Sequence, residues 1–165
     1  MKKYQLQDYA RIFGQEIPVA KIKDASVRKE IILLVSSLTK PAREIQEEID
    51  SARAKLVEGH ESEIQDWLHF TEKAKNCSDD TKRKELIAKA EACTEAIRIS
   101  KEFAEAVNTI IAEDAPEFPL RKVSLDSIIE ALMDAGKLNP EANIASIAAE
   151  FEPLIKDSDC TKGKV

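Results

Sequence analysis

The stretch at residues 31–56 reads IILLVSSLTKPAREIQEEIDSARAKL, and the stretch at residues 86–111 reads LIAKAEACTEAIRISKEFAEAVNTII. Each contains a stripe of positions spaced alternately by four and three, which averages to the 3.5-residue period of a coiled-coil stripe. Every stripe position but Ser100 carries an apolar side chain. Two stripes of equal length, separated by a polar stretch, predict an all-α fold built on a long antiparallel helical hairpin. The stripe positions are Ile31, Val35, Leu38, Ala42, Ile45, Ile49, Ala52 and Leu56, then Leu86, Ala90, Cys93, Ile97, Ser100, Ala104, Val107 and Ile111.

The composition agrees with an extended helical protein. Charged residues make up 34% of the 165 residues, aromatic residues only 5%, and there are four glycines. A protein of this length folds as one domain, so we expect a single elongated helical domain over residues 1–156. The tail at residues 157–165, which reads DSDCTKGKV, is expected to be disordered.

Charge and cysteine content narrow the compartment and the partners. The net charge of −6 is spread without long blocks of one sign, which argues against nucleic acid or anionic lipid as a partner. The longest apolar run, residues 31–35, is far shorter than the ~20 residues of a membrane span. An odd set of cysteines without a CxxC pair, Cys77, Cys93 and Cys160, fits reduced thiols. We therefore expect a soluble cytoplasmic protein in which Cys93 is a core residue.

Capping and breaking residues predict where the helices begin and end. A short helix should cover residues 4–14 and stop at Gly14. Asp24 should cap the first long helix, which runs to about residue 58 with a kink or short break near residues 37–41 caused by Pro41. After Gly59 a short connecting helix spans about 62–75, and Ser78 or Asp79 caps the second long helix, which runs to about residue 112. Ser124 should cap a helix that ends at Gly136, and Asn139-Pro140 should start a last one.

Two segments share the pattern Glu, apolar, Pro, apolar, any, Lys, apolar: EIPVAKI at residues 16–22 and EFPLRKV at residues 117–123. In an antiparallel hairpin both lie at the same end. Either residues 17–23 and 117–123 pair as a small two-stranded ribbon at the base of the hairpin, or both segments are linkers marked by proline. The pattern alone leaves these alternatives open.

The residues that commonly carry chemistry form no recognisable constellation. His60, His69 and Cys77 are spaced nine and eight apart, which fits neither a helical pair of ligands nor a zinc motif. The sequence has no glycine-rich phosphate loop, GxSxG or HExxH, and its carboxylates alternate with Lys and Arg as on a solvated helix face. We therefore expect no catalytic residue, no metal, no cofactor and no enzymatic activity.

The most aromatic patch of the chain is formed by Trp67, Leu68 and Phe70. These side chains are predicted to cap the open end of the hairpin, and any part of them left exposed would mark a contact with a partner. The lateral surface of a two-helix hairpin could likewise be covered by a protein partner or by a second copy of the chain.

The segment 124–152, with a helix, a turn containing glycine and a second helix, also describes a DNA-reading helix-turn-helix. Residues 121–156 hold four basic and six acidic residues, and the second helix has no Lys or Arg before Lys156. A packing corner between two helices is the better interpretation. A nucleic-acid-associated factor using this segment remains the alternative hypothesis.

The order of elements resembles that of a family of small uncharacterised tailed-phage and prophage proteins. The fragments that carry the resemblance lie at residues 17–19, 118–128 and 150–155, which read IPV, FPLRKVSLDSI and EFEPLI. The resemblance implies a helical hairpin, a phage or prophage origin in the host cytoplasm and no assigned activity. Together with the stripes it predicts a non-enzymatic accessory protein that acts through protein contacts in virion assembly or a neighbouring step.

Overall fold

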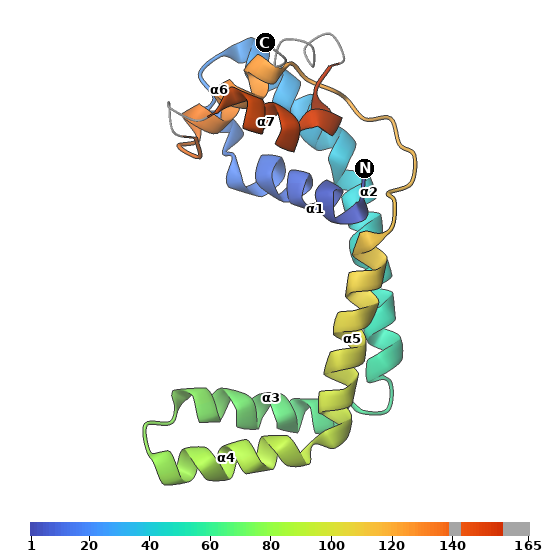
Figure 1. Ribbon diagram of the computed structural model, residues 1–165, viewed down its shortest axis with the longest axis vertical. Coiled ribbons are helices and arrows are strands. Elements are labelled where there is room, and N and C mark those ends of the chain that lie inside the picture. Colours follow the sequence, from blue (N-terminus) through green and yellow to red (C-terminus); the bar gives the residue numbers. More distant parts are fainter. Residues whose placement is uncertain (139–142, 157–165) are drawn as a thin grey trace. The chain divides into compact units, whose positions relative to one another are not determined.

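The computed structural model describes residues 1–138 and 143–156, and these residues are mainly helical (Figure 1). The all-α prediction is confirmed. The order of elements is α1 (Lys3–Arg11), η1 (Ile12–Glu16), η2 (Val19–Lys21), α2 (Ala25–Val57), α3 (Glu61–Asn76), α4 (Asp80–Ala92), α5 (Thr94–Ala112), α6 (Leu125–Asp134), α7 (Ile144–Glu150) and η3 (Glu152–Leu154). In the described part of the chain, no helix combines the length and the apolar composition that a bilayer span needs.

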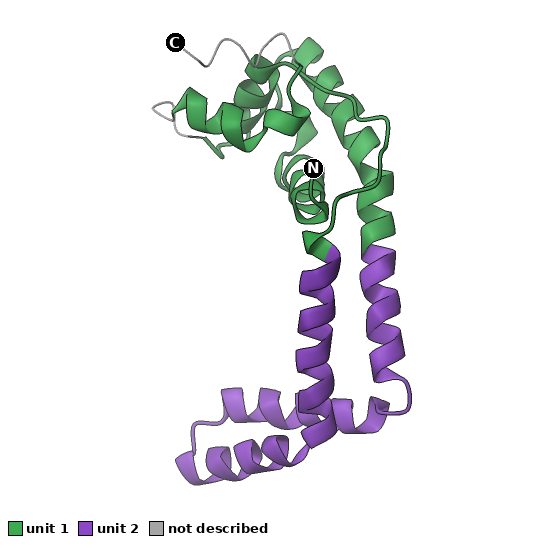
Figure 2. Cartoon of the chain, turned by 45° about the vertical axis from the view of Figure 1, so that its right-hand side comes forward, with its two compact units in different colours: residues 1–45, 111–165 green, residues 46–110 purple. Residues whose placement is uncertain are grey.

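The chain divides into two compact units, shown in different colours in Figure 2. Unit 1 contains residues 1–45 and 111–165, and unit 2 contains residues 46–110. Unit 1 is therefore assembled from both ends of the sequence. The single domain over residues 1–156 stays a prediction, and the predicted disordered tail at 157–165 lies outside the described residues.

Unit 1 contains a well-filled core. Tyr9 and Phe13 place their rings 5.7 and 5.6 Å from the ring of Phe151, and the Tyr9 hydroxyl donates to the carbonyl of Glu150 at 2.6 Å. Burial raises the pKa of Tyr9 to about 12. The fully enclosed side chains come from α1, η1, the segment before α2, α2, α6 and the C-terminal segment, and include Leu6, Phe13, Ile22, Ile31, Leu34, Leu38, Ile128 and Leu154.

In unit 2, the last part of α2 lies beside α5, and α3 packs against α4 (Figures 1 and 2). The predicted continuous helix from about residue 79 to 112 is wrong, because it is interrupted at Cys93, whose ψ of 67° is not helical. The first half of that expected helix, α4, consequently packs on α3.

The interruption also changes which face of α5 is buried. Ala96 and Ile99 are 1% and 4% exposed, whereas the predicted stripe residues Ser100 and Ala104 face solvent. The stripe on α2 is correct, since none of its positions is exposed. Cys93 is buried as predicted.

Several predicted boundaries are confirmed by hydrogen bonds or dihedral angles. Asp24 accepts from the amides of Ser26 and Val27, Asp79 from those of Thr81 and Lys82, and Ser124 from that of Ser127. Gly59 and Gly136 adopt the positive φ angles, 80° and 69°, that favour glycine at helix ends.

One local prediction is corrected and another is narrowed. Gly14 does not stop the first helix, since a π-helical turn carries the backbone on to Glu16. α2 is continuous through Pro41, which excludes the short break; the kink, which the unbroken register of the stripe favours, stays a prediction. The start expected at Asn139-Pro140 lies outside the described residues, and the described part of the last helix begins at Ile144 with Asn143 as its cap.

Of the two alternatives for residues 17–23 and 117–123, the small ribbon is not what the structure shows. Residues 19–21 make a 3-10 turn and residues 115–122 have no regular structure. Within the ranges that the structure describes, β-pairing is limited to isolated bridges that join Lys2 to Asp114 and Val123 to Ile155. The alternative interpretation, two linkers marked by proline, describes these segments.

Candidate protein-binding surface

Helix α3 carries the aromatic patch that the sequence singled out. It begins after Gly59, with Glu61 and Glu63 in its first turn, and ends with Lys73 and Lys75 in its last. This order of charges suits the helix dipole, whose positive end is the N-terminus. α3 thus forms for local reasons, and its apolar side chains are free to contact neighbouring helices.

A groove runs between α3 and α4 and encloses about 510 Å³. Its lining consists of positions one and two turns apart on each helix, together with the first turn of α5. Ala74 and Ala90 are buried at its floor, whereas Ile87 is 40% exposed on its wall. We call it the α3–α4 groove; its lining residues are Trp67, Thr71, Ala74, Lys75, Arg83, Ile87, Ala90, Glu91 and Ile97.

A smaller pocket of about 130 Å³ lies where α2, α3 and α5 meet within unit 2. Its wall is mostly apolar, with Leu56 and Val57 from α2 and Phe103 from α5. Trp67 lines both this pocket and the α3–α4 groove, and Leu68 at the pocket is 50% exposed. The two hollows therefore share Trp67 as a common wall.

The structure brings together two of the three predicted contact residues. Trp67 and Leu68 meet at the small pocket, but Phe70 lines neither hollow. Its ring lies 5.9 Å from Nζ of Lys89 on α4, in a cation–π contact. The partial exposure of Trp67 and the half exposure of Leu68 keep the predicted partner contact open as a hypothesis.

Sequence reasoning missed Ile87, which contributes the exposed apolar wall of the groove on α4. Ile87 lies next to Leu86, whose place in the predicted apolar stripe assigned Ile87 to the neighbouring face. The spacing of Arg83, Ile87 and Ala90 by four and three, one face of a helix, was the signal that could have found it.

The residues considered for metal binding are scattered. His60 precedes α3, His69 is exposed on α3, and Cys77 follows α3. Over residues 1–138 and 143–156, no group of three His, Cys, Asp or Glu side chains is placed to hold a metal ion. The buried thiol of Cys93 has its pKa raised, first by burial and then by the Glu63 carboxylate.

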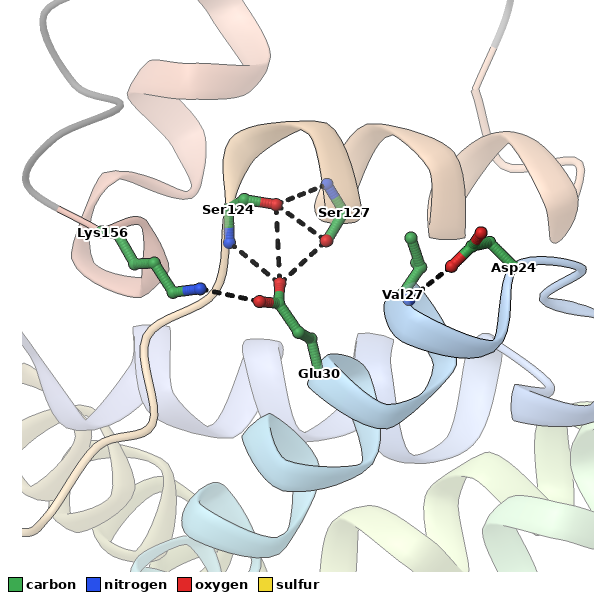
Figure 3. A network of polar contacts seen from close by, with 6 residues as sticks. All are labelled: Asp24, Val27, Glu30, Ser124, Ser127 and Lys156. Carbon is green, nitrogen blue, oxygen red and sulfur yellow. Dashed lines mark hydrogen bonds and ion pairs between the residues drawn. The ribbon is translucent and has the colours of Figure 1, made fainter.

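A polar cluster lies in unit 1 around Glu30 (Figure 3). The Glu30 carboxylate accepts from Lys156 Nζ at 2.7 Å and from Ser127 Oγ at 2.8 Å, and also from the Ser124 amide at 3.3 Å. These contacts lower the pKa of Glu30, with the Lys156 hydrogen bond as the largest cause. The cluster connects α2 to α6 and to the C-terminal segment, and its polar groups are hydrogen-bonded to one another.

This cluster bears on the helix-turn-helix hypothesis. Ser124 and Ser127 at the start of α6 contact Glu30 and are occupied in packing. The described helix α7 carries the acidic Glu150 and no Lys or Arg. No observation on these helices favours contact with nucleic acid.

Comparison of the chain with protein families, with curated proteins and with solved structures finds no match.

Proposed function

We propose that this chain is a non-enzymatic accessory protein of a phage or prophage that binds proteins through unit 2. The observation that carries the proposal is the α3–α4 groove with its neighbouring pocket, in which Trp67, Leu68 and Ile87 leave apolar surface uncovered. The wall positions on each helix repeat at intervals of three and four, so each helix turns one face toward the groove.

The chemistry of the groove suits a protein better than a small molecule. A small-molecule pocket needs convergent polar groups that fix the ligand's orientation. The charged residues of the groove, Lys75, Arg83 and Glu91, are all exposed. In the described ranges every buried side-chain nitrogen or oxygen has a hydrogen-bond partner, so none is left over to contact a ligand. Trp is among the commonest residues that dominate protein-binding energy, and covering a large apolar side chain contributes about 1.5–3 kcal/mol.

The phage assignment rests on the resemblance carried by residues 17–19, 118–128 and 150–155. It implies action in the host cytoplasm, during virion assembly or a neighbouring step. The genes beside the coding sequence should then encode tail or capsid proteins, and metabolic neighbours would contradict the assignment. Deletion of the gene should lower the yield of infectious particles, and unchanged yield and composition of the particles would contradict a role in assembly.

Site-specific photo-crosslinking tests the binding surface directly. A photoreactive phenylalanine analogue replaces Leu68, at the exposed edge of the pocket, in cells that produce the phage. The matched control carries the same analogue at Lys29, an exposed position of α2 in unit 1. We expect a protein adduct at position 68, absent at position 29 and weakened by Trp67→Ala. Equal labelling at both positions, or none at position 68, would refute the proposal.

A further inference from the structure

The charges of the α3–α4 pair are divided between its two ends. The tip, residues 69–84, has five basic residues against three acidic ones, a net charge of +2. The base, residues 61–68 and 85–92, has five acidic residues against one basic, a net charge of −4. The basic residues of the tip are Lys73, Lys75, Lys82, Arg83 and Lys84, and the acidic residues of the base are Glu61, Glu63, Asp66, Glu85 and Glu91.

The rim of the α3–α4 groove follows the same division. Arg83 lies near the tip and Glu91 near the base, eight residues or ~12 Å apart along α4. Ile87, the exposed apolar wall of the groove, lies midway between them. On α3, Lys75 at the tip and Trp67 toward the base are likewise eight residues apart, with Thr71 midway. When one copy of this pattern is turned end to end and laid against another, opposite charges face one another.

We propose that the face of the α3–α4 pair that carries the groove packs against the same face of a second copy, related by a two-fold axis that runs perpendicular to both helices. The inference rests on the proposed function and names the partner. This axis places α3 against α3 of the second copy and α4 against α4 of the second copy, and each pair runs antiparallel. Arg83 then faces Glu91 of the second copy, Ile87 faces Ile87, and the Lys75 ammonium faces the indole of Trp67, as in a cation–π contact.

The distribution of charge favours this symmetry over the other two-fold arrangement in which the same two faces meet. A two-fold axis parallel to the helices would place α3 against α4 and bring the two basic tips together. The two acidic bases would also meet. Like charges at a contact are unfavourable, whereas the antiparallel arrangement pairs tip with base twice.

The size of the surface sets the expected affinity. A pair of helices of 13 and 16 residues is ~20–24 Å long and ~20 Å wide, so the contact buries about 1,000 Å² in total. Stable specific interfaces bury about 1,200–2,000 Å², which places this one at the weak end. We expect association in the micromolar range that weakens with salt.

A charge swap tests the pairing. Arg83→Glu and Glu91→Arg are both at exposed positions, and each alone sets like charges opposite one another at two places. Each variant should associate at least tenfold more weakly than wild type in sedimentation equilibrium. An equimolar mixture restores both opposite-charge contacts and should recover wild-type association. The control Lys84→Glu makes the same charge change as Arg83→Glu outside the groove lining and should have a smaller effect that salt removes.

The apolar centre provides a second test. Ile87→Asp places two carboxylates opposite one another at the axis and should abolish association, with the helical circular dichroism spectrum unchanged. The pairing is overturned if wild type is monomeric at several hundred micromolar, if the mixture associates no better than its components, or if Ile87→Asp has no effect. A monomeric wild type with a Leu68 adduct to another protein would refute the second copy alone. A monomer without an adduct would refute the proposed function as well.

Discussion

Glu30 shows how one residue can hold distant parts of the sequence together. Its carboxylate receives hydrogen bonds from Ser124, Ser127 and Lys156, which lie 94 to 126 positions away. Nothing in the local sequence marks Glu30, since it sits among other charged residues at the start of α2. The Ser124 cap is predictable because its partner is three residues away, whereas the contact of the same serine with Glu30 depends on the tertiary fold.

Replacing Glu30 by Gln should lower the free energy of unfolding by about 1–2 kcal/mol at pH 7, because the ion pair with Lys156 is lost. The folded-state pKa of Glu30 lies below its usual value of 4.5. Its stabilising contribution is therefore complete above that value and disappears as the pH falls through the lowered pKa. Urea unfolding from pH 7 to pH 3 should show wild type and variant converging.

The control for this measurement is Glu44→Gln. Glu44 makes an exposed pair with Lys40 at 3.6 Å on the same helix, and such pairs contribute little. It should change the unfolding free energy by no more than a few tenths of a kcal/mol. A Glu30 variant that behaves like this control, or whose effect is independent of pH, would contradict the role assigned to the cluster.

At the level of elements, helix ends set by neighbouring residues were predictable and those set by other helices were not. Asp24, Asp79 and Gly59 act within a few positions of themselves. The start of α5 is different, because the amide of Glu95 donates to the carboxylate of Glu63 on α3 at 3.1 Å. Because the cap of α5 comes from another helix, the break at Cys93 has no local signal, and the helical period of the sequence runs across it.

The cap of α4 gives a test at this level. The sequence allowed either Ser78 or Asp79, and the structure selects Asp79, which accepts from two amides at 3.0 and 3.1 Å. Asp79→Ala should cost about 1 kcal/mol and speed hydrogen exchange in the first turn of α4. Ser78→Ala is the matched control and should leave both unchanged. Equal effects of the two substitutions would show that the cap does not stabilise α4.

At the level of the whole molecule, the candidate surface was only partly readable from the sequence. Trp67 and Leu68 stood out as an apolar patch on a short helix, and their exposure could be anticipated. The division of charge between tip and base is present in the sequence but has no meaning until α3 and α4 are known to lie side by side. Ile87 becomes a wall of the groove for the same reason.

The two units differ in how much apolar surface they enclose. Most of the fully buried side chains belong to unit 1, including Phe13, Leu34 and Ile128, whereas few residues of α3 and α4 are buried. Local opening is easiest where few apolar contacts hold an element. Amides in residues 61–92 should therefore exchange faster than those in residues 27–38, as hydrogen exchange with mass spectrometry can measure. Equal protection in the two segments would contradict this expectation.

Because unit 1 is made from residues 1–45 and 111–165, it cannot close before the residues that follow unit 2 have left the ribosome. When residues 46–110 leave the ribosome, Glu30 has none of its partners, and the apolar face of α2 around Ile31 and Leu34 lacks the helix α6 that follows in the sequence. Unit 2 is complete at that moment and can fold first. In the cell, unit 1 consequently reaches its native state only after translation has released Lys156, and until then a nascent chain exposes a surface that chaperones recognise.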